Sequence, residues 1–189
     1  MFPIVSGASA PAPEGWKNTH GIIGFQWTPT TNTNIINASG VIAADVATGG
    51  VQARGYVTGC EWGGDKGMFF GGYYGVWASW GGSNIVSNTG VIASDVAAVG
   101  TVRGQAPGVH FGTDQGLIGF SGGSTAVTNL VSNTGVCSAD VSGVGTARYG
   151  LAACEYSADK DKAIFGFGEA GDSVSMTNLV SNAGVIATD

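Results

Sequence analysis

Charge is scarce in this sequence of 189 residues. Charged side chains make up 11% of it and the formal net charge is −6, whereas about 25% charged residues is usual for a soluble domain. A chain with so few basic residues has no electrostatic attraction to phosphate backbones or anionic lipid, so we expect neither nucleic acid nor membrane as a partner. No apolar run reaches the roughly 18 residues of a membrane span.

Other common features are missing as well. The sequence starts without the basic and apolar segments of a secretory signal, so no export is expected. No stretch keeps a 3.6-residue apolar period, so helix should be scarce. Cysteine is rare, and an odd number without an export signal predicts reduced, buried thiols rather than disulfides. The three cysteines are Cys60, Cys137 and Cys154.

Glycine, by contrast, is abundant. It supplies 34 of the residues, whereas its average usage in proteins is about 7%. The glycines follow no three-residue period, which excludes collagen. An apolar fraction of 43% is too high for a disordered chain. These features predict one ordered, glycine-rich, all-β domain.

A turn block recurs four times along the chain. Each copy has a marker glycine and, five residues later, an aspartate. The marker glycines are Gly40, Gly90, Gly135 and Gly184, and the aspartates are Asp45, Asp95, Asp140 and Asp189. A short apolar run interrupted by glycine precedes each block, as in 116–120 (GLIGF), and such runs are typical of buried strands. Three or four strands in 45 to 50 residues is the size of one propeller blade.

The repeat predicts a small β-propeller with four blades in a single domain, 1–189. Its units are 21–66, 67–115, 116–162 and 163–189, and we expect residues 6–20 to complete the last, shorter unit and close the ring. Closure would remove free sheet edges, which invite aggregation. The alternative is that the chain is one piece of a multi-chain ring, as in a homo-oligomer.

The order of arginine, glycine and apolar strands resembles the kelch repeat. Arg148 is followed by the run 164–168 (IFGFG), and Arg54 is followed by the run 69–72 (FFGG). The resemblance implies kelch-like blades and a propeller fold.

The near-identical turn blocks, such as 129–136 (NLVSNTGV), also resemble glycine-rich repeats in structural proteins of tailed bacteriophages. That resemblance implies a virion component, a capsid decoration or tail-associated protein. Its partners would be capsid or tail proteins, and it would be made in the host cytoplasm and located in the virion. The resemblance carries over no functional residue.

All three arginines occupy one slot of the repeat. They are Arg54, Arg103 and Arg148, and they follow Asp45, Asp95 and Asp140 by nine, eight and eight residues. A residue that recurs in every unit builds the units, so we predict structural ion pairs, which add specificity more reliably than stability. An axial ring of aspartates could bind a cation such as calcium. The aspartates lack the dense spacing of a dedicated calcium loop, however, so no metal or cofactor is expected.

The search for a catalytic site finds none, and we expect a protein that is not an enzyme. No Gly-x-Ser-x-Gly elbow is present, and no Gly-x-Gly-x-x-Gly opens a helix. His20 and His110 lie in different units. No spacing supports the site of two His, two Tyr and one Cys that copper oxidases of kelch-like architecture need.

One connection departs from the repeat. Residues 73–82 (YYGVWASWGG) contain four aromatic side chains, and aromatics in a variable loop are typical anchors for a partner. We therefore predict that Tyr74, Trp77 and Trp80 bind a partner; alternatively, they fill the outer edge of the second blade. The leading hypothesis is a non-catalytic, protein-interacting virion component. The second is an adhesin that binds host-surface glycans, with one shallow site per blade.

Overall fold

The computed structural model describes residues 21–25, 31–46, 50–62, 66–87, 89–97, 100–121 and 125–189. These residues form fourteen β-strands and no helix, which confirms the all-β prediction. Within these ranges there is accordingly no helix that could cross a membrane.

The strands form four antiparallel sheets and one separate hairpin. The first sheet contains β1 (Gly21–Gly24) and β2 (Thr33–Ile36). The second contains β3 (Thr58–Trp62), β4 (Lys66–Phe70), β7 (Gly82–Val86) and β8 (Val96–Ala97). The third contains β9 (Gly108–Phe111), β10 (Gln115–Ser121) and β11 (Thr125–Val131). The fourth contains β12 (Ala152–Glu155), β13 (Ala163–Gly166) and β14 (Thr177–Val180), and the hairpin contains β5 (Tyr73–Tyr74) and β6 (Ala78–Ser79).

The repeat produces the same strand register in every sheet. The glycine-interrupted runs are the strands β1, β4, β10 and β13, and each pairs with the strand that leads into the turn block. The equivalent pairs are Gly21 with Ile36, Gly67 with Val86, Gly116 with Val131, and Ala163 with Val180. In the turn that follows, the marker glycine has a left-handed backbone, with φ of +79° at Gly90 and Gly135. Only glycine adopts this conformation without steric cost, which explains why it recurs there.

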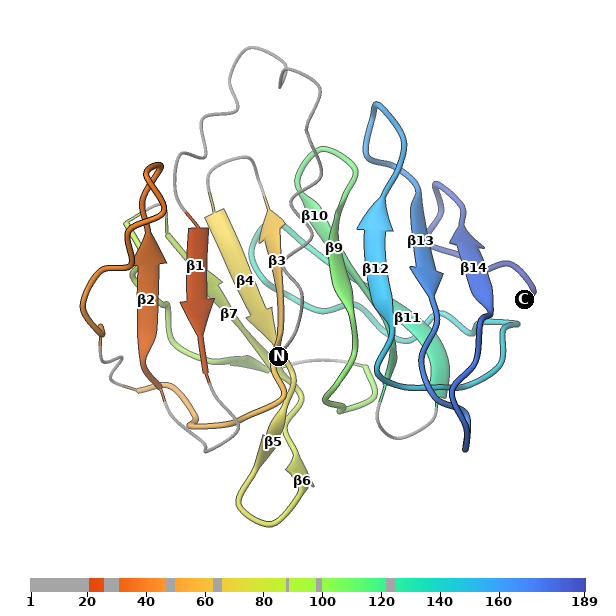
Figure 1. Ribbon diagram of the computed structural model, residues 1–189, viewed down its shortest axis with the longest axis horizontal. Coiled ribbons are helices and arrows are strands. Elements are labelled where there is room, and N and C mark those ends of the chain that lie inside the picture. The colour runs from red at the N-terminus through yellow and green to blue at the C-terminus, as the bar shows by residue number, and fades with distance from the viewer. Residues whose placement is uncertain are drawn as a thin grey trace.

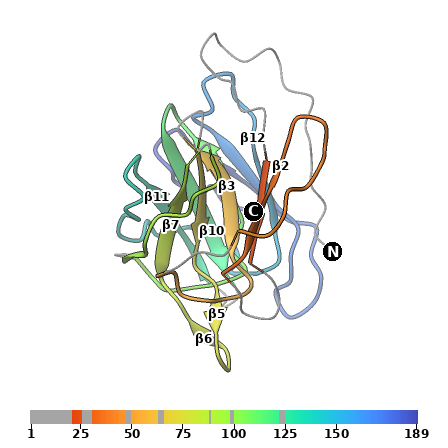
Figure 2. The same cartoon turned by 90° about the vertical axis from the view of Figure 1, so that its left-hand side faces the viewer.

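The four sheets are arranged as a fan (Figure 1). The strands β3, β9 and β12 lie next to one another, while the first and fourth sheets lie at opposite ends of the molecule. In the side view, the strands β7 and β11 lie on one side of the molecule and β2 and β12 on the other (Figure 2). Three apolar clusters fill the spaces between successive sheets, so the core is divided among the sheet boundaries.

The sheet boundaries differ from the predicted units by one strand. Strand β3, placed in the unit 21–66, pairs with β4 of the following unit. Strand β12, placed in the unit 116–162, pairs with β13 in the same way, so the fourth sheet takes its first strand from Ala152–Glu155. Consecutive strands joined by short connections usually pair with each other. The predicted unit boundaries separate β3 from β4 and β12 from β13, which are such pairs.

The predicted closing segment, residues 6–20, lies outside the described residues. Among the strands that the structure describes, none pairs the first sheet with the fourth. The described strands therefore form an open fan, and the closure expected through residues 6–20 stays a prediction.

Candidate functional site

The three arginines are the largest fully buried side chains of the described residues. Each lies in the connection that leads into the first strand of its sheet. A buried guanidinium must be hydrogen-bonded and paired with an opposite charge, because its desolvation is otherwise too costly. The partners of each arginine therefore define one site in each of the second, third and fourth sheets.

Arg148 shows the arrangement in the fourth sheet. Its Nη1 donates to Asp189 Oδ1 (3.1 Å) and to the carbonyl oxygen of Thr146 (3.0 Å). Its Nε donates to the carbonyl oxygen of Phe167 (2.8 Å), and its Nη2 donates to Asn178 Oδ1. Asn178 Nδ2 in turn donates to Asp189 Oδ1 (2.9 Å). The arginine, asparagine and aspartate form a closed triangle that we call the Arg–Asn–Asp network.

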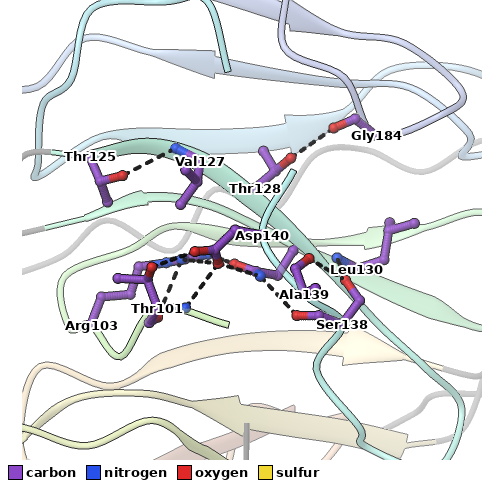
Figure 3. A network of polar contacts seen from close by, with 11 residues as sticks. Thr101, Arg103, Thr125, Val127, Thr128, Leu130, Ser138, Ala139, Asp140 and Gly184 are labelled. Atoms are coloured by element: carbon purple, nitrogen blue, oxygen red, sulfur yellow. Dashed lines mark hydrogen bonds and ion pairs between the residues drawn. The ribbon is translucent and has the colours of Figure 1, made fainter. Parts of the chain in front are cut away.

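The third sheet has the same network (Figure 3). Arg103 Nη2 donates to Asn129 Oδ1, and Asn129 Nδ2 donates to Asp140 Oδ1 (2.9 Å). The amide and the hydroxyl of Thr101 both donate to the Asp140 carboxylate. Burial alone would raise the pKa of Asp140, but these hydrogen bonds and Arg103 lower it below the usual value. The carboxylate is therefore held in its charged form.

Arg54 completes the set in the second sheet. It donates to Asn84 Oδ1, and Asn84 Nδ2 donates to Asp95 Oδ1 (2.8 Å). Burial lowers the pKa of Arg54 to about 10, and the charge of Asp95 opposes that shift. Arg54 therefore remains protonated at neutral pH.

The arginines do not pair with the aspartates that stand eight or nine residues before them in the sequence. Arg103 lies with Asp140, and Arg148 lies with Asp189, so each arginine meets the aspartate that follows it by about 40 residues. Asp45 instead accepts hydrogen bonds from Asn32 and Asn34. The antiparallel sheet explains this choice, because it brings the end of a repeat unit back beside its beginning.

Sequence reasoning missed the asparagines that join the two charges. They are Asn34, Asn84, Asn129 and Asn178. Their strict recurrence, one residue in every unit at the same distance before the marker glycine, was the available signal. Asparagine suits this position because one amide can accept from the guanidinium and donate to the carboxylate.

Aromatic rings lie over all three guanidinium groups, and the Phe70 ring is 5.9 Å from Arg103 Cζ. Phe25 and Trp80 lie over Arg54, with ring centroids 4.4 and 3.9 Å from Cζ. Phe120 of the third sheet lies over Arg148 of the fourth at 4.6 Å. Such contacts favour a desolvated cation, so the networks stabilise the boundaries between sheets as well as the sheets themselves.

The hairpin β5–β6 projects away from the sheets (Figure 1). At its tip Val76 is 94% and Trp77 59% exposed. The Trp77 ring contacts Tyr56 (centroids 5.4 Å apart) and Tyr73 (5.7 Å), and Tyr74 is exposed beside them. We call these five residues the aromatic patch. Two of the three predicted binding residues, Tyr74 and Trp77, belong to it.

Trp80, the third of them, lies elsewhere. It is half-buried at the base of the hairpin, and its ring covers Arg54. It therefore belongs to the buried network of the second sheet and not to the aromatic patch.

A second polar cluster joins three sheets near the strands β3, β9 and β12. Lys160 Nζ lies 3.0 Å from Glu61 Oε1 and 3.9 Å from Glu155 Oε1. His110 beside them is 1% exposed. Burial lowers the pKa of His110, and the charge of Lys160 lowers it further, against opposing effects of Glu61 and Glu155. Glu61 belongs to the second sheet, His110 to the third and Glu155 to the fourth, so the cluster ties these sheets together.

His110 predicts a pH dependence of stability. Because its folded pKa lies below the usual 6.5, the unfolded chain takes up the proton first as pH falls, so the free energy of unfolding should decrease below about pH 6.5. Denaturant unfolding at pH 7.5 and pH 5 measures this loss, and His110→Gln should reduce it. An unchanged loss in the His110→Gln protein would contradict this account of the pH dependence.

The cysteines differ in exposure. Burial raises the pKa of Cys137 to about 11 and that of Cys60 to about 12. Cys154 is exposed, contrary to the prediction of three buried thiols. None of the three forms a disulfide in the described residues. Among those residues, no three His, Cys, Asp or Glu side chains are grouped so as to hold a metal ion.

Comparison with known proteins places the fold. No family model and no curated protein matches the sequence. The structure of YjhT, a kelch-type β-propeller, is similar with a TM-score of 0.59 and 11% identity, over 80% of this chain and 49% of YjhT. A fungal alcohol oxidase of the AA5 family, in complex with copper, matches with a TM-score of 0.49 and 10% identity, over 89% of this chain and 50% of that one; this score is too low to support an argument. The chain spans about half the length of both structures, and at 11% identity its likeness to YjhT concerns the fold alone.

Proposed function

We propose that the chain is a non-catalytic interaction domain that docks on another protein of a larger assembly through the aromatic patch. The observation that carries this proposal is the exposure of Val76 and Trp77 on the one connection that departs from the repeat. Large exposed apolar side chains gathered in one place mark interaction surfaces, and tryptophan and tyrosine supply much of the energy of protein interfaces.

The patch is preorganised for binding. Trp77 has a left-handed backbone, with φ of +64°, a conformation that costs a non-glycine residue about 1–2 kcal/mol. The contacts of its ring with Tyr56 and Tyr73 hold the side chain in place. A partner would then lose little further conformational entropy on binding, which favours affinity.

The turn blocks resemble those of tailed-phage structural proteins, and this resemblance supports a virus particle as the larger assembly. A protein partner is favoured over one glycan site per unit because the patch occurs on a single connection. The Arg–Asn–Asp networks support a non-catalytic role, since they recur from sheet to sheet and their guanidinium groups are buried.

The double variant Tyr74→Ser/Trp77→Ser tests the docking role. Its melting temperature should stay within a few degrees of that of the parent, because both side chains are exposed. Its co-sedimentation with the virus particles that bind the parent chain should be lost. Val144→Ser, which alters an exposed apolar residue elsewhere, is the control and should co-sediment normally. Normal co-sedimentation of the double variant would refute the proposal, and loss of binding to a glycan array would favour the adhesin instead.

Trp80→Ser should behave differently from the patch variants. The change removes the ring that covers Arg54, so we expect it to lower the free energy of unfolding by about 2–4 kcal/mol. Thermal unfolding followed by circular dichroism measures this effect. An unchanged melting temperature would place Trp80 with the patch.

A further inference from the structure

Neighbouring sheets contact each other through two different faces. We call the face that contacts the following sheet the forward face, and the face that contacts the preceding sheet the rear face. On the forward faces of the first three sheets, the contacting residues include Ile22, Met68 and Leu117. They pack against three rear positions of the next sheet, occupied in turn by Phe69, Val86 and Ile92; by Ile118, Val131 and Cys137; and by Phe165, Val180 and Ile186.

The rear face of the first sheet has the same chemistry but is open to solvent. Its equivalent positions are Ile23, Ile36 and Ile42. Ile23 is 42% and Ile42 58% exposed, whereas every equivalent side chain of the other three sheets is at most 8% exposed. The first sheet thus exposes an apolar surface whose equivalents on the other three sheets are buried.

The forward face of the fourth sheet is open as well. Leu179 is 51% exposed, whereas its equivalent Leu130 lies against Gly184 of the following sheet. Phe167 is 61% exposed, whereas its equivalent Phe120 is fully buried against the fourth sheet. The exposure of Cys154 has the same origin, since it lies on this face.

A polar contact shows the same complementarity. Thr128 Oγ1 donates to the carbonyl oxygen of the marker Gly184 (2.8 Å), across the boundary between the third and fourth sheets. The equivalent donor on the fourth sheet is Thr177, which is exposed. The equivalent glycine on the first sheet is Gly40, and the space where a Cβ would stand is open there. The donor residue of an equivalent contact therefore lies on the fourth sheet, and its acceptor residue lies on the first sheet of the same chain.

We propose that two copies of the chain bind head to tail, with the forward face of the fourth sheet of each copy packed on the rear face of the first sheet of the other. A second copy is the occupant that fits because each open face matches, position by position, a face already in contact within the chain. Two such contacts related by a two-fold axis close a ring of eight sheets, within the range of about four to eight blades in known propellers. This assembly does not depend on the aromatic patch.

Size-exclusion chromatography with light scattering tests the assembly. The full chain should have twice the mass of 18.9 kDa. Leu179→Lys and Ile42→Asp should each reduce the mass to that of one chain, because either change places a charge in both contacts of the ring. Val76→Lys, at an exposed position on the hairpin, is the control and should leave the mass doubled.

Mixing the two disrupted variants gives the sharpest result. A ring containing one copy of each variant brings the introduced lysine and the introduced aspartate together at one contact. The other contact of that ring joins two unchanged faces, so the mixture should recover the doubled mass.

A cross-link tests the same contact without disrupting it. Cys60 Sγ lies 3.4 Å from the place of a Cβ on Gly116 in the following sheet, and the equivalents of these residues across the proposed contact are Cys154 and the Gly21 of the other copy. Under a mild oxidant, Gly21→Cys should form a covalent dimer that Cys154→Ser abolishes.

Several outcomes would overturn the proposal. A single-chain mass for the parent protein at high concentration means that the faces do not meet. A growing series of masses means that the contact forms filaments instead of a ring. A dimer unaffected by Leu179→Lys and Ile42→Asp, or one that fails to cross-link, uses another surface.

Discussion

Replacing Arg148 with alanine should lower the free energy of unfolding by about 3–5 kcal/mol, the cost of removing one partner from a buried ion pair. The change leaves the Asn178 side-chain oxygen and the Asp189 carboxylate without their shared donor. It also empties the space under the Phe120 ring. Because Asp189 retains some contact with solvent, we expect a value near the lower end of this range.

The control is Lys162→Ala, which removes a charge of the same sign at an exposed position directly before strand β13 and should change stability by less than about 0.5 kcal/mol. The loss of stability in Arg148→Lys should fall between those of the two alanine variants, because lysine keeps the charge but lacks the planar guanidinium that reaches several acceptors. Denaturant unfolding measures all three variants. An Arg148→Ala protein as stable as the Lys162→Ala protein would contradict a structural role for the network.

The second large effect concerns Phe120, whose ring lies between the third and fourth sheets, 5.5 Å from the Phe165 ring. Phe120→Ala should cost about 3–5 kcal/mol, as is usual for a buried phenylalanine. Phe167 is a matched control, since it occupies the equivalent position with a similar left-handed φ (+63° against +58°) but is exposed. Phe167→Ala should cost less than about 1 kcal/mol at concentrations where the chain is a single copy. Equal costs for the two variants would contradict the sheet packing.

Recurrence along the sequence predicted the strands and indicated that the arginine slot is structural, because each unit repeats the same local structure. It could not predict which strands share a sheet, since the strands on both sides of the unit boundary have the same apolar character. The ion pairs depend on that pairing, which is why Asp189 and not Asp140 lies beside Arg148.

Exposure could not be predicted from the repeat at all. Cys60 and Cys154 occupy equivalent positions, but only Cys60 is followed by another sheet. Trp77 and Trp80 stand three residues apart in one aromatic run, and the turn of the hairpin directs one to solvent and the other over Arg54. In both pairs the environment is set by neighbours distant in sequence.

The central claim is that residues recurring in every unit build the sheets, and the most direct test is the hydrogen exchange of the arginine side chains. The chain has only the three arginines of the networks, and all are buried. The Nε–H groups of Arg54 and Arg148 donate to backbone carbonyl oxygens. In ¹⁵N NMR spectra at about pH 7.5, we expect the arginine Nε–H signals to persist and exchange slowly with solvent. Signals broadened beyond detection by fast exchange, as for arginines on a protein surface, would contradict the account.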